Sequence, residues 1–106
     1  SSYVNVSPDD LSTMLDDGTP LVNVHVPYEG EIEGTDLFIP FTDIEQRVGE
    51  LPTDRSAKII LYCMTGRMSD TAARTLVQLG YTNVWNLDGG MVAWQEAGYQ
   101  IVDSPS

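Results

Sequence analysis

The chain of 106 residues contains one cysteine and one histidine. A single cysteine cannot form an internal disulfide bond, and one cysteine with one histidine cannot complete a zinc site. The sequence also lacks the GxGxxG motif, the P-loop motif and the ligand spacing of an EF-hand. These absences exclude a disulfide framework, and they leave no recognisable pattern for a structural metal or a bound nucleotide.

Basic residues are scarce, since 5 lysines and arginines stand against 16 aspartates and glutamates, for a formal net charge of −11. Such a molecule repels nucleic acids and anionic membranes, so we expect neither as a partner. An anionic substrate would also be repelled by the molecule as a whole. Any attraction for it must therefore come from a local site.

Long apolar runs are missing too, because no stretch approaches the roughly 18 residues that span a bilayer. No signal peptide is visible, and the chain begins at Ser1 without a methionine, as a processed piece of a longer protein would. We expect a soluble protein, cytoplasmic or exported after loss of an N-terminal segment. The length and a hydrophobic content of 42% indicate one globular domain, residues 1–106.

Apolar patterns along the chain alternate between strand and helix. We expect strands at residues 3–6, 21–26, 57–62, 82–87 and 99–102, and helices at residues 7–18, 42–51, 69–79 and 91–98. Residues 27–40 are expected to form a long loop. This alternation predicts an α/β domain with a mainly parallel sheet, in which ligands bind beyond the carboxyl ends of the strands. The loops at residues 27–40, 63–68 and 88–90 should gather there.

The segment KIILYCMTGRMSD places Cys63 between a buried strand and the start of a helix. The first turn of a helix has unpaired N–H groups, and a loop curled with the help of Gly66 can aim further N–H donors at an anion. These donors, with a guanidinium from Arg67, favour a thiolate over a thiol. Two interpretations remain: Cys63 is a nucleophile, or it is an inert buried residue. Met64 and Met68 could likewise belong to the core or line a site.

Other candidates have simpler explanations. Arg74 lies four residues after Asp70 on a polar helix face, which favours a solvated ion pair. His25 lies in an alternating strand, where a hydrogen-bonded structural histidine is favoured over a general base. Trp85 and Trp94 are expected to pack in the interior. Four acidic residues crowd the long loop and are either solvated charges or a rim that filters substrates: Glu29, Glu31, Glu33 and Asp36.

The segment IILYCMTGRMSDTAARTLVQLGYTNVWNLDGGMVAWQEAGY closely resembles a single-domain rhodanese, a thiosulfate sulfurtransferase-like module. The cysteine loop, the LGYTNV stretch and the LDGGMVAW stretch come in the family's order, and the resemblance covers residues 58–102. Weaker similarity extends to SPDDLSTML and LVNVHV in the first half. The resemblance implies a small three-layer domain, with a mainly parallel central sheet flanked by helices.

The resemblance also implies a reaction. Cys63 would attack the outer sulfur of thiosulfate, or of a similar small anionic donor, and become a persulfide. The loop from Met64 through Thr65, Gly66 and Arg67 to Met68 would cradle that sulfur, and Arg67 would hold the sulfonate. The sulfur would then pass to cyanide or a thiol, or to an acceptor protein, without a metal or an organic cofactor.

The first half of the chain departs from the family pattern. Asn23 and His25 stand where the family has the Asp and Arg of an Asp-Val-Arg run, and Glu31 stands where it has a histidine. Two alternatives therefore stay open. One is a non-catalytic binding or regulatory domain, or a sulfur carrier, although the presence of Cys63 with Arg67 argues against it. The other is a cysteine phosphatase or arsenate reductase, but the tyrosine-phosphatase arginine, six residues after the cysteine, is replaced here by Ser69.

Overall fold

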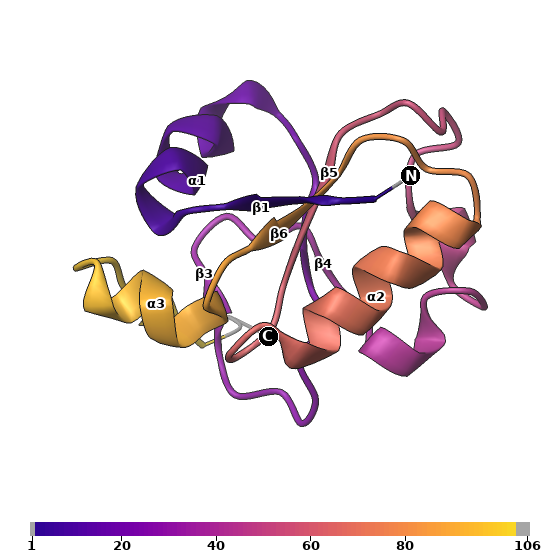
Figure 1. Ribbon diagram of the computed structural model, residues 1–106. Coiled ribbons are helices and arrows are strands. Elements are labelled where there is room, and N and C mark those ends of the chain that lie inside the picture. Colours follow the sequence, from indigo (N-terminus) through magenta and orange to yellow (C-terminus); the bar gives the residue numbers. More distant parts are fainter. Residues whose placement is uncertain (1, 104–106) are drawn as a thin grey trace.

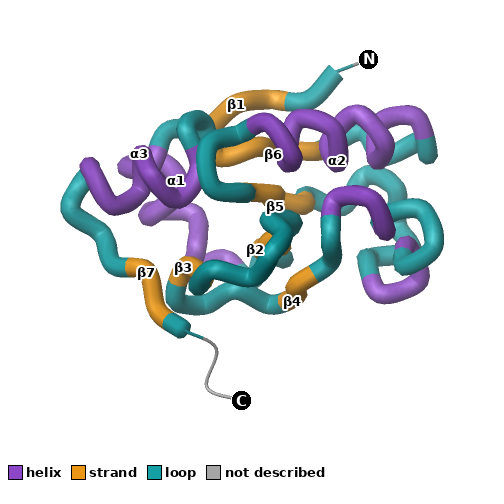
Figure 2. The backbone as a smooth tube through the Cα atoms, turned by 90° about the horizontal axis from the view of Figure 1, so that it is seen from below, coloured by secondary structure: helices purple, strands orange, loops and turns teal. Residues whose placement is uncertain are grey.

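The computed structural model of the protein describes residues 2–103, apart from the side chain of Asp16. Its centre is a five-stranded sheet in the order β1-β6-β5-β2-β4 (Figure 2). Every neighbouring pair of strands in this sheet is parallel. The strands are β1 (Val4–Val6), β2 (Leu21–Asn23), β4 (Leu37–Phe38), β5 (Ile59–Tyr62) and β6 (Val84–Leu87). The α/β class and the mainly parallel sheet are confirmed.

Helices cover both faces of this sheet (Figure 1). Helix α2 (Arg67–Gln78) lies on one side, and α1 (Pro8–Met14) and α3 (Gly90–Glu96) lie on the other. The side chains of β5 alternate between two hydrophobic clusters. Ile59 and Leu61 pack on the side of α2, whereas Ile60 and Tyr62 pack with Leu11, Met91 and Trp94. Both faces of β5 are buried, which explains its nearly continuous apolar sequence.

Some expected elements differ in length or type. Strand β2 ends at Asn23 rather than at residue 26, because the Asn23 Oδ1 atom accepts the backbone N–H of His25 at 3.0 Å and turns the chain. The expected loop at residues 27–40 contains β4 and also β3 (Glu31–Ile32), which pairs antiparallel with β7 (Ile101–Val102). The strand expected at residues 99–102 is therefore shorter and lies outside the main sheet.

The prediction of a helix at residues 42–51 is wrong. Two short 3₁₀ turns, Phe41–Asp43 and Val48–Glu50, occupy this stretch instead. It contains Gly49 and several β-branched residues, which lower helix propensity, and so short an isolated helix is marginal without a large buried face. Short 3₁₀ turns are a common form of such connectors.

The sheet brings the segments after β2, β5 and β6 together. Asn23 and Tyr62 are paired at the carboxyl ends of β2 and β5, so the chain leaving each strand emerges at the same edge. The start of α3, which follows β6, contacts the residues after β5 through two hydrogen bonds: Met91 N–H to the Cys63 carbonyl at 2.9 Å, and Val92 N–H to the Met64 carbonyl at 3.0 Å. Within residues 2–103, none of the helices has the length and apolarity to cross a membrane.

Candidate active site

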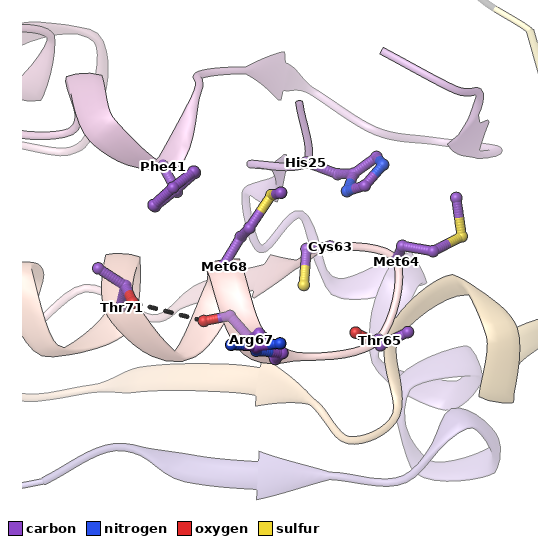
Figure 3. A pocket seen from close by; sticks show the side chains of 8 residues that line it. All are labelled: His25, Phe41, Cys63, Met64, Thr65, Arg67, Met68 and Thr71. Carbon is purple, nitrogen blue, oxygen red and sulfur yellow. Dashed lines mark hydrogen bonds between the residues drawn. The ribbon is translucent and has the colours of Figure 1, made fainter. Parts of the chain in front are cut away.

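A cavity of about 360 Å³ opens at this edge of the sheet (Figure 3). Eight residues line it: His25, Phe41, Cys63, Met64, Thr65, Arg67, Met68 and Thr71. Five of the six residues that the sequence proposes for the site are among them. The sixth, Gly66, contributes its backbone.

Cys63 lies on the floor of the cavity. The residue follows β5 directly and is only 1% exposed, yet its Sγ atom has polar neighbours. The backbone N–H of Gly66 donates to Sγ at 2.9 Å, and the Ser69 hydroxyl donates to Sγ at 3.4 Å. Donors of this kind bind a thiolate more strongly than a thiol. The sulfur is thus buried, but it lies among hydrogen-bond donors at the edge of an open cavity.

Ser69 is a contributor that the sequence did not indicate. Its side chain is fully buried in the first turn of α2, and its hydroxyl also lies 3.3 Å from the Gly66 carbonyl. In the sequence, Ser69 stands six residues after Cys63, at the position of the tyrosine-phosphatase arginine. In the folded chain the same spacing brings a hydroxyl next to the sulfur.

The loop curls through Gly66, whose φ of 115° favours glycine, and α2 begins immediately afterwards. The first N–H to pair with Gly66 is that of Asp70, at 3.0 Å. The N–H groups of Arg67, Met68 and Ser69 precede it and have no carbonyl partner within the helix, because a helix leaves its first donors unpaired. The positive end of the helix dipole therefore lies beside Cys63.

Helix α3 holds the loop from outside. Two of its backbone N–H groups donate hydrogen bonds to the carbonyls of Cys63 and Met64, so these carbonyls turn towards α3 and away from the cavity. Gly90 permits this close approach: a Cβ atom there would lie 2.5 Å from each of the two carbonyl oxygens. The Asp88-Gly89-Gly90 stretch thus supports the shape of the cysteine loop without lining the cavity.

Arg67 is the cation of the cavity wall. Within residues 2–103, no carboxylate lies at ion-pair distance from its guanidinium. Arg74, by contrast, pairs with Asp70 at 3.1 Å on the exposed face of the same helix, which confirms the expected surface ion pair. Of these two arginines on α2, the one beside the cavity is the one available to an anionic ligand.

The rest of the wall is largely apolar. Met64 and Met68 both line the cavity together with Phe41, and both also pack against the buried core, so each methionine takes both of the roles considered for it. Met68 also accepts a long contact from the Val26 N–H, at 3.5 Å from its Sδ atom. Thioether and aromatic groups provide a polarisable, poorly hydrated lining that suits a sulfur-containing ligand.

His25 also lies on the cavity wall, a position that its local sequence pattern did not indicate. It has the hydrogen bond expected of a structural histidine, 2.5 Å from its Nε2 atom to Glu29 Oε1, but its ring also lies on the cavity wall. The position of His25 depends on the pairing of Asn23 with Tyr62, because this register brings His25 and Cys63 to the same edge of the sheet. Two other acidic residues of the loop have partners of their own: Asp36 accepts the Leu21 N–H, and Glu31 accepts the Tyr28 hydroxyl.

Comparisons with known proteins agree with this geometry. The sequence model of the Rhodanese-like domain matches residues 7–97. A sulfurtransferase from Allochromatium vinosum is 39% identical over 85 residues, 77% of each chain. The thiosulfate sulfurtransferase PspE of Escherichia coli is 31% identical over 70 residues, 64% of this chain and 67% of PspE. A crystal structure of a rhodanese-related protein from Thermoplasma volcanium superimposes with a TM-score of 0.82 at 28% identity, covering 96% of this chain and all of that one.

Proposed function

The chain belongs to the rhodanese-like domain family, and from this membership we propose that it is a sulfurtransferase acting through a persulfide on Cys63. The donor is thiosulfate or a similar small anion, and the acceptor is a thiophile such as a thiol or cyanide. The observation that carries the proposal is the position of Cys63 Sγ, which lies on the floor of a cavity, 2.9 Å from the Gly66 N–H and near Arg67, a cation without an ion-pair partner among the described residues.

The first half-reaction loads the cysteine. The Cys63 thiolate attacks the outer sulfur of thiosulfate, the sulfur–sulfur bond of the donor breaks, and sulfite leaves with the electron pair of that bond. Arg67 binds the sulfonate oxygens through charge-assisted hydrogen bonds and holds the outer sulfur near Sγ. The N–H groups of the loop and of the first turn of α2 stabilise the negative charge of the persulfide.

In the second half-reaction, the outer sulfur of the Cys63 persulfide passes to the acceptor. A thiolate or cyanide attacks the outer sulfur of the persulfide, the bond between this sulfur and Cys63 Sγ breaks, and Sγ returns to its thiolate form. Gly66 N–H and the Ser69 hydroxyl are positioned to stabilise this leaving group. Dividing the transfer into two displacements is covalent catalysis by an activated nucleophile.

The experiment that tests this proposal is mass spectrometry after incubation with thiosulfate and removal of the excess. The wild-type chain should gain the mass of one sulfur atom, located on Cys63 by peptide mapping. Cys63→Ser should remain folded, gain nothing and transfer no sulfur to cyanide. A wild-type chain that never gains sulfur from thiosulfate would contradict the proposal for this donor, and full transfer by Cys63→Ser would contradict the mechanism.

The same sample separates the alternatives. A cysteine phosphatase would be protected from alkylation at Cys63 by vanadate, whereas we expect protection by thiosulfate. The phosphatase alternative also lacks its arginine, since the residue six positions after Cys63 is Ser69, a fully buried neutral side chain. A non-catalytic binding domain would be neither loaded by thiosulfate nor protected by it.

A further inference from the structure

His25 is an ionisable residue on the cavity wall that has no role in the two half-reactions of the proposed mechanism. Three of the eight lining residues are ionisable, namely His25, Cys63 and Arg67. The imidazole side chain is 10% exposed, and its Nε2 atom lies 2.5 Å from Glu29 Oε1. No hydrogen bond joins the other ring nitrogen, Nδ1, to any residue in the described part of the chain. Figure 3 shows the ring between Met64 and Met68, on the side of Cys63 opposite Arg67.

The contact with Glu29 determines which ring nitrogen carries the proton in the neutral imidazole. A carboxylate only accepts hydrogen bonds, so Nε2 must be the donor, and Nδ1 is left with a free electron pair. A neutral histidine in this tautomer can accept a proton at Nδ1, and the carboxylate of Glu29 then stabilises the resulting cation. The charged and titratable groups around the ring are Glu29 from its own loop, Cys63 from the end of β5 and Arg67 from α2.

The second half-reaction needs a base of this kind when the acceptor is a thiol. A thiol with a pKa of about 8.5 is only about 3% thiolate at pH 7, and the thiolate is the nucleophile. A base at the cavity wall could generate the thiolate where it reacts. Neither Arg67, which has no lone pair to offer, nor the departing Sγ can fill this role.

We propose that His25 Nδ1, with Nε2 hydrogen-bonded to Glu29, removes the proton from an acceptor thiol bound in the cavity. This inference rests on the proposed sulfurtransferase function. The acceptor thiol gives its proton to Nδ1, and its sulfur attacks the outer sulfur of the Cys63 persulfide. The bond between the two persulfide sulfurs breaks, Cys63 leaves as a thiolate, and the acceptor departs as a persulfide. His25 then returns the proton to the product or to water, and no external oxidant or reductant is consumed.

The test measures the two half-reactions separately. Wild type, His25→Gln and Glu29→Gln are loaded with thiosulfate, freed of excess donor, and mixed at pH 7 with free cysteine or with sulfite. The attacking sulfur of the sulfite dianion carries no proton, so sulfite needs no base. Glu45 is an exposed acidic residue that is not among those lining the cavity, so Glu45→Gln removes the same charge as Glu29→Gln and serves as the matched control.

We expect His25→Gln to slow the discharge to free cysteine by about tenfold to thirtyfold, the gain available when only about 3% of such a thiol is ionised. Loading by thiosulfate and discharge to sulfite should keep their wild-type rates. The defect should shrink as the pH rises and the thiol ionises without help. Glu29→Gln should show a smaller defect, also confined to the thiol, and Glu45→Gln should behave as wild type.

Other outcomes overturn the inference in distinguishable ways. Equal losses with sulfite and with the thiol would make His25 a structural residue, and an unchanged thiol rate would remove it from proton transfer. If His25→Gln does not fold, Glu29→Gln decides, because Glu29 has a 52% exposed side chain and its substitution keeps the shape of the site. If no variant or wild type is loaded by thiosulfate, the proposed function itself fails first.

Discussion

At the scale of single residues, Arg67 and Arg74 offer a comparison within one helix. In the described part of the chain, Arg67 has no carboxylate partner and is the only permanent cation among the residues that line the cavity, and its substitution removes this charge. Hydrogen bonds to charged groups contribute about 1.5–3 kcal/mol, so Arg67→Ala should raise the KM for thiosulfate by about tenfold to a hundredfold. Steady-state kinetics with thiosulfate and cyanide measure this effect.

Arg74→Ala is the matched control. Its side chain is 72% exposed and forms a surface ion pair with Asp70, an interaction worth only a few tenths of a kcal/mol. The KM for thiosulfate should stay at its wild-type value. A similar rise in KM for both variants would mean that general charge, and not the cavity position of Arg67, attracts the donor.

At the scale of elements, the contact of α3 with the cysteine loop depends on Gly90. An added Cβ would lie 2.5 Å from the carbonyl oxygens of Cys63 and Met64, and the residue has a φ of 63°. Gly90→Ala should therefore lower the free energy of unfolding by about 2–5 kcal/mol, through overpacking and an unfavourable backbone conformation together. Sulfur transfer should fall as well, because the loop must move. Chemical denaturation and a transfer assay measure the two effects.

Gly98→Ala separates these causes. Gly98 also has a positive φ, 99°, but no atom of the residues that the structure describes lies within 4 Å of the position that a Cβ would occupy. This variant should lose only about 1–2 kcal/mol and keep its rate of sulfur transfer once folded. If Gly90→Ala were no worse than Gly98→Ala, close contact between α3 and the loop would not matter to the site.

Tyr62 connects β5 with the β3 region on the face of the sheet opposite α2. Its hydroxyl accepts the Ile32 N–H at 2.9 Å and lies 2.7 Å from Thr35 Oγ1, and burial raises the pKa of Tyr62 to about 12 from its usual value of 10.0. A raised folded-state pKa means that this contribution to stability is complete below pH 10. It is lost between pH 10 and 12, where the unfolded chain ionises first.

Tyr62→Phe should therefore change the stability in two ways. At pH 8 the variant should be less stable by about 1–3 kcal/mol, because the buried Ile32 N–H loses its acceptor. Between pH 10 and 12 it should lose less stability than the wild type, since it has no phenol to ionise at this position. Denaturant unfolding at pH 8, 10 and 12 measures both changes. Parallel curves for the two proteins across this pH range would show that Tyr62 does not titrate as a buried group.

Some elements of this protein follow from local sequence patterns, and others depend on contacts between distant segments. The strand at β5 and the helix at α2 were predictable, because the apolar run and the helical periodicity are local patterns and the burial of both elements matches them. The Cys63 loop was predictable for the same reason. His25 was not, because its place beside Cys63 depends on the register of β2 and β5. The 3₁₀ turns at Phe41–Asp43 and Val48–Glu50 depend on packing that no local pattern records.

At the scale of the whole molecule, the net charge of −11 acts on every ligand that approaches. A cationic thiol such as cysteamine should accept sulfur from the loaded protein faster than an anionic thiol such as mercaptoethanesulfonate at low salt. The ratio of the two rates should fall towards a constant value as salt is added, since the screening length shrinks to about 10 Å at 0.1 M. Discharge kinetics over a salt series measure the ratio. A ratio of rates that does not change with salt concentration would mean that only groups within the cavity act on the acceptor.

The attachment of the cysteine loop to α3 has an evolutionary consequence. The loop is fastened through the main-chain carbonyls of residues 63 and 64, and the sulfur is met by the main-chain amide of Gly66. Peptide groups are present whatever the amino acid, so Met64 and Thr65 can be exchanged without dismantling the anchorage. Point mutations at these two positions can therefore change the lining of the cavity in descendants of this chain, while the main-chain contacts of the cysteine loop are inherited intact.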